Sequence, residues 1–357
     1  MSSVGPRSDK KARPQRQDAR RRVTLKDIAR HAGVATGTVS MVMNNSPLVA
    51  DATREHVLRV IKQHGYVYHR AAGQLRKKRT NIVGVSLCDL LNPYFAEIAA
   101  GVAEVLEEHG RVLFLGSNGE SVARQERFLD TLREYDVEGV LLMPAMGTPR
   151  SVVHRLREWH VPVIMVSRYV AGVEADYVGV DNRRGIALAT SHLLEHGHRR
   201  IAFVGLTRGT TTGRDRYAGY RHALTSASIP LESELVIECT PTRQDGYRAV
   251  HALFELAQPP TGIVCFNDLL AFGVMLGLRQ LGIEPGRGCS VVGADDVTEA
   301  SLWVPPLTTM AIDSAALGRA AAQLLRERLE APEAPARRVV GPPRLVVRAS
   351  SGPAPKS

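Results

Sequence analysis

The sequence has few cysteines and few aromatic residues, and it lacks long apolar runs. Its 357 residues include four cysteines, widely spaced and without a CxxC pair. We therefore expect buried free thiols in a reducing compartment and no disulfide framework. No apolar stretch is long enough to span a bilayer. The basic N-terminus is not followed by the apolar segment of a secretory signal, so we expect a cytoplasmic protein without a membrane segment.

Positive charge is concentrated at one end of the chain. Residues 1–80 hold 18 Lys and Arg against 5 Asp and Glu, whereas the remainder holds 28 against 31. A strongly basic segment on a nearly neutral body is typical of a nucleic-acid-binding module. A basic membrane-surface segment is the competing interpretation, but residues 7–22 contain no aromatic anchor. Residues 1–22 cannot build a core, and we expect a disordered basic tail there.

Two short helices with a tight turn between them are predicted directly after this tail. Thr24 can cap the first helix, which runs to about residue 31, and Gly33 suits a left-handed turn. The second helix begins near residue 35 or 36 and buries Val39 and Val42. Its other face carries small or uncharged residues: Thr36, Gly37, Thr38, Ser40, Met41 and Asn44.

This pattern favours a helix-turn-helix, whose second helix lies in the DNA major groove. A third amphipathic helix is predicted at residues 51–63. An ordinary helical hairpin in a core is the alternative, but a solvated helix face normally carries charge. The uncharged face suits close approach to base edges better.

From residue 81 onward, short apolar runs alternate with segments of helix length. Two sets of such units predict an α/β fold with two doubly wound parallel-sheet lobes. Ligands bind beyond the carboxyl ends of such strands, here in the cleft between the lobes. The predicted strands are 82–87, 112–115, 139–143, 163–166, 201–204, 235–237, 262–265 and 289–292. The predicted helices are 94–109, 122–135, 149–160, 183–196, 214–227, 244–257 and 268–281.

The basic segment resembles the headpiece of the LacI/GalR family of bacterial transcription regulators. The matching letters are Thr-Leu-Lys-Asp-Ile-Ala, Ala-Gly-Val, Thr-Val-Ser and Val-Met-Asn within residues 24–44, then Thr53-Arg54, Val57, Ile61 and His64-Gly65-Tyr66. The resemblance extends over residues 23–348. It implies a periplasmic-binding-protein-like core and a sequence-specific repressor controlled by a small molecule. Residues 236–240 and the pair Ser167-Arg168 are similar to the maltose-regulon repressor branch.

The resemblance also implies how the chain is divided. A headpiece covers 23–67, a hinge helix or linker 68–80, and an effector-binding and dimerisation core 81–348, followed by a flexible tail at 349–357. Lobe crossings are expected near Ser167, Asp295 and Met310. Lobe 1 then takes 81–166 and 295–310, and lobe 2 takes 167–294 and 311–348. The C-terminus lacks the Leu heptads of a tetramer, so we expect a homodimer on double-stranded operator DNA.

DNA contacts are expected from the exposed face of the second helix, from Thr24 and from the linker. In the family, a linker Leu enters the minor groove, and Leu75 is the matching residue here. Such an apolar wedge unstacks a base step while a neighbouring cation, here Arg76, holds phosphate.

Three features depart from the family pattern. Tyr68-His69 stands where Pro-Asn is usual after a Tyr, and Gly73 costs about 1 kcal/mol of helix stability. Met41 replaces an Arg that would read guanine, a contact worth about 1–3 kcal/mol of discrimination. Met41 offers only apolar contact, for example to a thymine methyl, so the family's typical operators are not expected here.

The effector site is expected where strands end. Asn92, Tyr94 and Phe95 resemble the family's Asn-Pro-aromatic turn, and Arg216 matches its effector-binding Arg. An Arg with amide and carboxylate partners holds several hydroxyls at fixed spacing, which predicts a sugar or a sugar derivative. Ser167 stands where some sugar-responsive members carry Asp. The other residues that match family cleft positions are Arg168, Asn267, Asp268 and Asp295.

Structural alternatives remain for two of these residues. Tyr94 could pack only against a helix end. Asp268 could serve only as a cap of the following helix.

The rival classes are a solute-binding protein and a sugar-processing enzyme with an accessory DNA-binding headpiece. The sequence contains no P-loop, no Gly-x-Ser-x-Gly elbow and no GxGxxG after the first strand, so we expect no enzyme and no cofactor. His192 and His196 share a helix face, and His198 follows. The sequence has no zincin signature. We therefore interpret these histidines as the end of a helix that is followed by a strand, and no metal site is expected.

Overall fold

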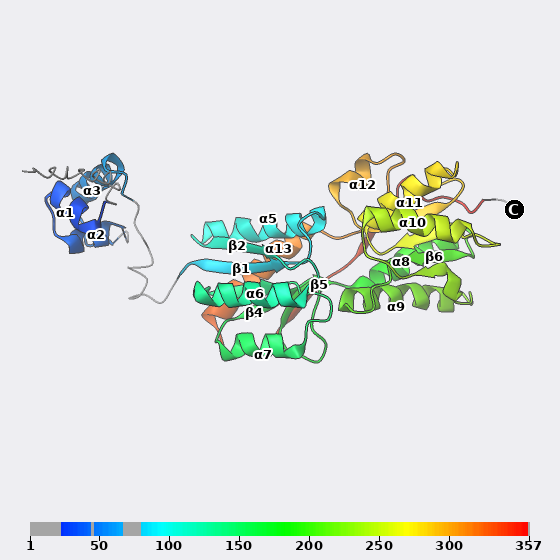
Figure 1. Cartoon of the computed structure of the whole chain (residues 1–357), viewed down its shortest axis with the longest axis horizontal. Helices are drawn as coiled ribbons and strands as arrows, with labels where there is room; N and C mark the ends of the chain where they lie inside the picture. The colour runs from blue at the N-terminus through cyan, green and yellow to red at the C-terminus, as the bar shows by residue number, and fades with distance from the viewer. Residues whose placement is uncertain (1–22, 44–45, 67–79, 356–357) are drawn as a thin grey trace, which may run out of the picture. The chain divides into compact units, whose positions relative to one another are not determined.

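The computed structural model describes residues 23–43, 46–66 and 80–355. The chain divides into two compact units, residues 1–78 and 79–357 (Figure 1). The predicted basic tail, all but one residue of the predicted linker, and the predicted DNA contacts Asn44, Leu75 and Arg76 lie outside the described residues. The same holds for Tyr68, His69 and Gly73.

The first unit holds the three predicted helices around a small apolar core. They are α1 (Leu25–Ala32), α2 (Thr36–Met43) and α3 (Asp51–Gln63). Thr24 caps α1 as predicted, and Asp27 completes a capping box by accepting from the Thr24 backbone N–H. Gly33 ends α1 in the left-handed conformation, at φ 64°. The core that fixes α2 consists of Ile28, Ala29, Ala32, Val39, Val42, Val49, Val57 and Val60.

The second unit contains two six-stranded sheets, and we call each sheet with its helices a lobe. The lobe 1 sheet has the order β11-β5-β4-β3-β1-β2, and all its pairs are parallel. Its strands are β1 (Ile82–Leu87), β2 (Val112–Ser117), β3 (Gly139–Leu142), β4 (Val163–Val166), β5 (Asp176–Val180) and β11 (Arg338–Gly341). Its helices are α5 (Pro93–Glu108), α6 (Val122–Glu134), α7 (Arg150–Glu158) and α13 (Ser314–Glu330).

The lobe 2 sheet has the order β12-β10-β9-β8-β6-β7, and only β12 is antiparallel to its neighbour. Helices α8 and α9 pack together as one pair, and α10 and α11 as another (Figure 1). The strands are β6 (Ile201–Val204), β7 (Val236–Ile237), β8 (Gly262–Cys265), β9 (Ser290–Asp295), β10 (Thr308–Ala311) and β12 (Arg344–Val346). The helices are α8 (Asn182–Glu195), α9 (Thr211–Ser226), α10 (Arg243–Phe254), α11 (Asp268–Gln280) and α12 (Thr298–Leu302), with a short 3-10 helix η1 (Ser233–Leu235).

Glycines allow the closest helix contact in lobe 1. A Cβ on Gly101 of α5 would meet the carbonyl oxygen of Ala315 at 2.1 Å, and one on Gly318 of α13 would meet that of Ile98 at 2.1 Å. Both distances are far below van der Waals contact, so any larger residue would push α5 and α13 apart. This pair covers one face of the lobe 1 sheet, whereas α6 and α7 cover the other.

The predicted lobe boundaries were wrong. The chain passes between the sheets after β5, after β10 and between β11 and β12. The passage after β10 lies beside Met310, as predicted, but it leads from lobe 2 to lobe 1, and no passage lies at Ser167 or Asp295. Strand β5 was missed because it begins with the charged Asp176 and contains Gly179. The structure buries Asp176 against Arg328, whose Nε donates to the carboxylate at 2.7 Å. Strand β10 was missed because it begins with two threonines.

The predicted flexible tail is ordered at residues 349–355. The Ser350 side chain is wholly buried, and its hydroxyl donates to the Val291 carbonyl at 2.7 Å and accepts from the Thr308 backbone N–H at 2.8 Å. The backbone N–H of Ala354 also donates to the His196 carbonyl at 2.8 Å. These bonds satisfy polar groups of lobe 2, which a Ser- and Pro-rich composition does not reveal.

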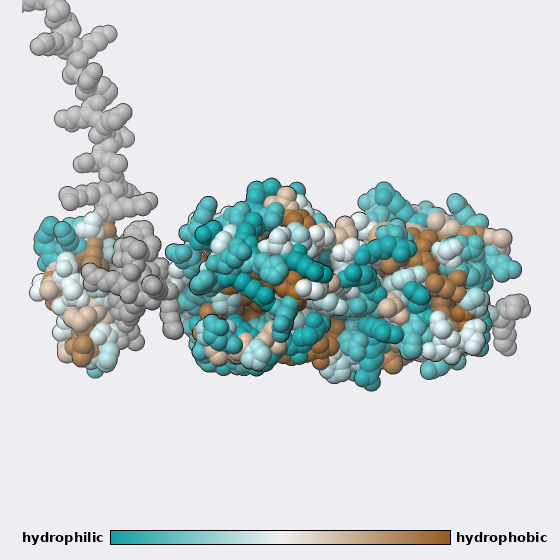
Figure 2. Space-filling model, turned by 90° about the horizontal axis from the view of Figure 1, so that it is seen from below, coloured by the Kyte–Doolittle hydropathy of each residue, from teal (hydrophilic) through white to brown (hydrophobic). Residues whose placement is uncertain are grey.

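On the face seen in Figure 2, polar residues cover most of the surface of the second unit, and apolar residues appear there in smaller groups. Within the described ranges, no helix combines the length and apolar character needed to cross a bilayer. The exposed apolar residues include Leu90 and Leu91 after β1, Val112 and Leu115 on the edge strand β2, and Leu276 and Leu281 of α11 and its end.

Candidate DNA-binding surface and ligand cavity

The outer face of α2 is uncharged and accessible. Thr36, Gly37 and Met41 are exposed, and Thr38 and Ser40 are half-buried. Behind this face, Val39 and Val42 anchor α2 in the core of the first unit. Small side chains on a firmly anchored helix allow the backbone to approach a base edge closely.

Thr24 already has a structural task. Its hydroxyl donates to the Asp27 carboxylate at 2.6 Å and accepts from the Asp27 backbone N–H at 3.3 Å. The hydroxyl has one proton, and Asp27 already accepts it. A contact with a DNA phosphate, which also accepts hydrogen bonds, therefore competes with the cap of α1.

The second unit contains a cavity of about 260 Å³ where strand ends of the two lobes meet. Every wall comes from a segment at the carboxyl end of a strand or from the start of a following helix, as the fold predicts. Seven of the eight predicted effector residues line it together: Asn92, Tyr94, Phe95, Arg168, Arg216, Asn267 and Asp295.

Arg216 is held in a buried network on the lobe 2 wall. Its guanidinium donates to the Asn182 side-chain oxygen at 2.8 Å, to the Asp295 carboxylate at 3.0 Å and to the Phe266 carbonyl. Arg216 and Asp295 are only 3% and 4% exposed. The guanidinium also stacks over the Phe266 ring, 4.6 Å from its centre. Each of the three guanidinium nitrogens therefore has a partner, and three of the five N–H groups are used before any ligand arrives.

Asp295 occupies an unusual backbone conformation in this network, with φ at 121°. A non-glycine residue in this region is strained, and such strain persists only where surrounding contacts hold it. Burial raises the pKa of the Asp295 carboxyl, and the Arg216 guanidinium opposes that effect.

The lobe 1 wall depends on fewer contacts. The Tyr94 hydroxyl donates to the Ser167 hydroxyl at 2.8 Å, and Arg168 donates to the Glu120 carboxylate at 2.6 Å. Glu120 is 35% exposed, so water reaches this ion pair. Burial raises the pKa of Tyr94 to about 12, and the phenol therefore stays protonated at neutral pH.

Two amide groups complete the polar lining. Asn92 and Asn267 cap α5 and α11 through their side-chain oxygens, which accept from the backbone N–H groups of Tyr94 and Leu270. Among the described residues, neither amide nitrogen has a hydrogen-bond partner, so both can donate into the cavity. With the carboxylates and the rings of Tyr94 and Phe95, the cavity offers donors, acceptors and apolar surfaces for a polyhydroxylated ring.

Asp268 does not belong to this set. It is wholly buried behind the wall, where it accepts from the Thr309 hydroxyl at 2.6 Å and from the Val297 backbone N–H at 3.0 Å. Burial raises the pKa of its carboxyl. Its neighbour Asn267 is both the cap of α11 and the residue that lines the cavity.

Sequence reasoning missed several lining residues and the support of Arg216. Asn182 was missed because β5, which precedes it, was missed. Glu120 and Thr240 follow β2 and β7, so the same strand-end rule could have identified them. The missed lining residues are Cys88, Asp89, Ser117, Gly119, Glu120, Thr212, Thr240, Pro241, Thr242 and Phe266, with Ser167 noted only as a departure. Burial raises the pKa of the Cys88 thiol to about 12, so it is a poor nucleophile.

Comparison with known proteins agrees with both parts of this description. Residues 24–68 match the bacterial regulatory proteins of the lacI family, and residues 190–351 match a periplasmic binding protein-like domain. The maltose regulon regulatory protein MalI of Escherichia coli strain K12 is 31% identical over 338 residues, covering 91% of this chain and 98% of MalI.

Two solved structures extend the comparison to the whole fold. A complex of the transcriptional regulator CelR with cellobiose is 33% identical, with a TM-score of 0.71, covering 92% of this chain and all of that one. A lac repressor dimer bound to operator and the anti-inducer ONPF is 25% identical, with a TM-score of 0.83, covering 93% of this chain and all of that one.

Proposed function

This chain belongs to the lacI family of bacterial regulatory proteins, and we propose how its two units carry out that role. The family consists of DNA-binding transcription regulators and not of enzymes. The chain is accordingly a repressor with a helix-turn-helix headpiece, and its effector binds in the core. Residues of α2 recognise the operator, and residues of the ligand cavity recognise the effector.

The effector is a neutral sugar or a sugar derivative held in the cavity between the lobes. The main support is the wall made by Arg216, Asp295 and Asn267. It presents the ion pair of Arg216 and Asp295 and the amide group of Asn267 at fixed positions. Asn92, Tyr94, Phe95 and Arg168 supply the facing wall. Cation and carboxylate are already paired on each wall, so a neutral ligand fits better than a charged one. The cellobiose complex of CelR, a relative, supports this chemistry.

Thermal unfolding of the full chain with a panel of mono- and disaccharides tests this assignment. A true effector at 100 times its Kd should stabilise the protein by about 2.7 kcal/mol. The same sugar must change operator affinity. A sugar that stabilises the core but leaves operator affinity unchanged would contradict the proposal that it regulates DNA binding. Such a result would favour a solute-binding role.

Operator bases are read by the exposed face of α2. Thr36, Gly37, Thr38 and Ser40 approach base edges, and Met41 makes an apolar contact in place of bidentate guanine recognition. Asn44, Leu75 and Arg76 belong to the same proposal through the resemblance to the family, and Thr24 joins it near the phosphates. Selection of bound sequences from random duplexes at near-physiological salt tests it. An enriched palindrome is expected, and binding that only fades as salt rises would contradict sequence-specific recognition.

The wedge role of Leu75 has its own test. Leu75→Ala should weaken binding to the selected operator while leaving binding to unrelated duplex unchanged. An equal loss of affinity for both duplexes would contradict the wedge role of Leu75.

The functional assembly is a homodimer in the cytoplasm, where its operator DNA lies. A relative, the lac repressor, binds operator as a dimer. Exposed apolar side chains on both lobes support self-association, among them Val112 at 59% exposure and Leu276 at 46%. Sedimentation equilibrium should give twice the chain mass of 38.9 kDa, and a monomer at micromolar concentration would contradict the proposal.

Effector and operator are coupled through the arrangement of the two lobes. The cavity takes one wall from each lobe, so a bound ligand favours one relative rotation over another. A 100-fold change in operator affinity requires the effector to discriminate the two arrangements by about 2.7 kcal/mol. Operator titrations with and without the stabilising sugar measure this directly.

A further inference from the structure

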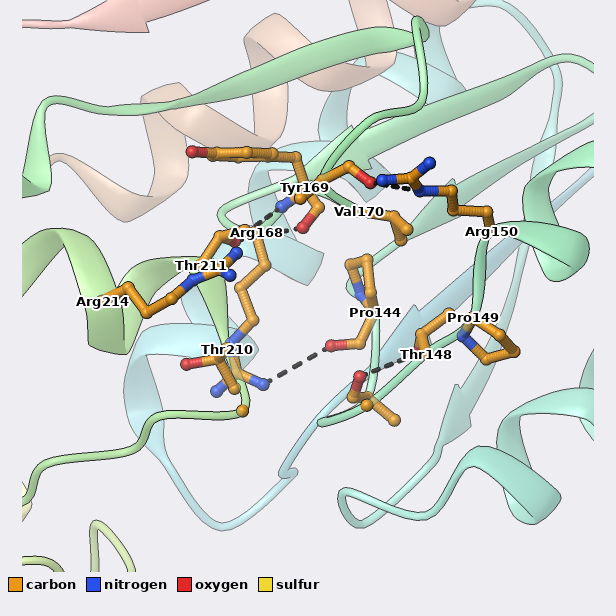
Figure 3. Close-up of a pocket in the computed structure, with 14 residues that line it drawn as sticks. Pro144, Thr148, Pro149, Arg150, Arg168, Tyr169, Val170, Thr210, Thr211 and Arg214 are labelled. Atoms are coloured by element: carbon orange, nitrogen blue, oxygen red, sulfur yellow. Dashed lines mark hydrogen bonds between the residues drawn. The ribbon is translucent and has the colours of Figure 1, made fainter.

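A second cavity lies beside the ligand cavity and has a different character. It has a volume of about 240 Å³, far above the roughly 10–15 Å³ needed for one water. Loops of lobe 1 at residues 144–150 and 168–171 form one side, and residues 209–214 of lobe 2 form the other (Figure 3). Arg168 borders both cavities. We call this second cavity the arginine pocket.

The lining of the arginine pocket is positively charged. Arg150, Arg168 and Arg214 belong to it, and none of its lining residues is Asp or Glu. Figure 3 shows their side chains reaching the pocket from different sides. In the ligand cavity, by contrast, Arg216 faces Asp295 and Arg168 faces Glu120.

Two of the three cations lack a carboxylate partner. Arg150 donates through Nε to the Ala171 carbonyl at 2.9 Å. Within the described part of the chain, no Asp or Glu forms an ion pair with Arg150 or Arg214. Asp215 lies next to Arg214 in the chain, and the Arg214 charge acts on its carboxyl, but Asp215 is hydrogen-bonded to Tyr169 and does not line the pocket. The pocket therefore holds two guanidinium groups, those of Arg150 and Arg214, that form no ion pair with a described carboxylate.

The start of α9 adds to this charge. The helix has 16 residues, and Thr210 caps it by accepting from the Gly213 backbone N–H at 3.0 Å. Thr210 and Thr211 both line the pocket. The partial positive charge of a helix N-terminus favours an anion at this position.

We propose that the arginine pocket binds the phosphate group of a small phosphorylated metabolite. Guanidinium groups match phosphate geometry and remain charged at any physiological pH. Arg150 and Arg168 belong to lobe 1 and Arg214 to lobe 2, so one bound phosphate cross-links the lobes beside the effector. Occupancy of the pocket then favours the lobe arrangement described here and changes effector affinity without contact between the two ligands.

The lobes already touch at this place through weaker contacts. The Thr211 hydroxyl accepts from the Tyr169 backbone N–H and donates to the Tyr169 carbonyl, both at 3.1 Å. The Thr212 hydroxyl donates to the Ser167 carbonyl at 3.2 Å. A phosphate would add charge-assisted bonds across the same junction, so its effect on the lobes should be cooperative with these contacts.

Calorimetric titration of the full chain with inorganic phosphate, replacing chloride at constant ionic strength, tests the proposal. Saturable binding is expected, and Arg214→Ala and Arg150→Ala should each weaken it at least tenfold. Arg208→Ala is the matched control, because Arg208 lies in the loop that precedes α9, pairs with Glu238 and does not line the pocket. The phosphate affinity of Arg208→Ala should stay within twofold of that of the natural chain. The basic N-terminus is common to all variants, so its nonspecific attraction cancels.

Three further arms complete the test. Arg214→Lys should retain part of the affinity, and an unchanged thermal midpoint of Arg214→Ala without phosphate shows that folding is intact. If glucose 6-phosphate binds more tightly than inorganic phosphate, and Arg214→Ala abolishes this difference in affinity, the natural ligand is a phosphosugar. If the two bind with equal affinity, the natural ligand is a free inorganic anion. Absence of saturable phosphate binding, or equal binding in Arg214→Ala and Arg208→Ala, overturns the proposal. Operator binding by Arg214→Ala is unaffected in either case, which separates this test from that of the repressor function.

Discussion

The two walls of the ligand cavity are built differently. On the lobe 2 wall, Arg216 and Asp295 are almost wholly buried and every guanidinium nitrogen has a partner. On the lobe 1 wall, Tyr94 holds Ser167 through one hydrogen bond, and Arg168 pairs with a Glu120 that solvent reaches. The lobe 2 wall is a preorganised anchor, and the lobe 1 wall can rearrange at lower cost than the lobe 2 wall. A ligand that bridges them therefore moves lobe 1 groups more readily than lobe 2 groups.

Removing the anchor should have the largest effect. Arg216→Ala leaves the Asp295 carboxylate buried without a cation, which should lower the free energy of unfolding by about 3–5 kcal/mol. The effector response should be lost while operator binding persists at temperatures where the protein remains folded. Denaturant unfolding and operator titration check both parts.

A second variant keeps this prediction testable if Arg216→Ala folds poorly. Arg216→Ala combined with Asp295→Asn removes the buried charge and should recover part of the lost stability. An effector response that survives in the double variant would move the ligand site elsewhere.

The ion pair of Arg168 and Glu120 on lobe 1 should matter more for ligand binding than for stability. Glu120→Gln removes the carboxylate partner of the buried Arg168, so the free energy of unfolding should fall by about 1.5–3 kcal/mol, less than for Arg216→Ala, while effector affinity changes severalfold. Glu126→Gln is the matched control, since Glu126 pairs with Arg155 outside the cavity. If Glu120→Gln lowered the free energy of unfolding as much as Arg216→Ala does, the claim that the two walls differ in rigidity would be wrong.

The Tyr94–Ser167 bond should have a smaller effect. Tyr94→Phe and Ser167→Ala should each lower the free energy of unfolding by about 0.5–1.5 kcal/mol. The double variant should lose less than the sum of the two, because each single change already breaks the same bond. Additive losses would show that the two hydroxyls are not coupled.

The smallest effect concerns the edge of lobe 2 far from the cavity. Burial lowers the pKa of His198, whose Nε2 lies 3.1 Å from the Gly352 carbonyl in the C-terminal segment and whose Nδ1 lies 2.9 Å from the Thr261 hydroxyl. The folded state binds a proton less readily than the unfolded state. The stability contributed by neutral His198 is therefore present above about pH 6.5 and is lost as the pH falls below it.

Thermal midpoints between pH 7.5 and 5 should fall more steeply in the natural chain than in His198→Asn. Substitution of the exposed His154 by Gln should leave the slope unchanged. Equal slopes in all three proteins would show that His198 does not contribute.

The sequence was most informative where one local pattern determines the structure. Thr24, Gly33 and the apolar spacing of residues 24–43 identify the headpiece helices because caps and periodicity act over a few residues. Arg216 and Asp295 were predicted because they match family positions, and both line the cavity. Asp268 was misplaced because adjacent residues at a helix start point in different directions, and only the fold shows that Asn267 faces the cavity while Asp268 faces Thr309.

Long-range partners account for two of the remaining errors. Asp176 reads as a strand breaker until Arg328, 152 residues away, neutralises it. The C-terminal segment reads as flexible until Ser350 is seen buried between Val291 and Thr308. Neither pairing leaves a signal in the nearby sequence, so one sequence without relatives could not have revealed them.

The three passages of the chain between the lobes have a consequence for biosynthesis. Lobe 1 starts at residue 80, yet α13, which packs on α5 through Gly101 and Gly318, ends only at residue 330, and β11 ends at residue 341. On the ribosome, most of lobe 2 is therefore made while one face of the lobe 1 sheet still lacks its covering helix. Neither lobe can be produced alone by cutting the gene once. The nascent chain must keep the apolar residues of that face from aggregation until α13 has emerged.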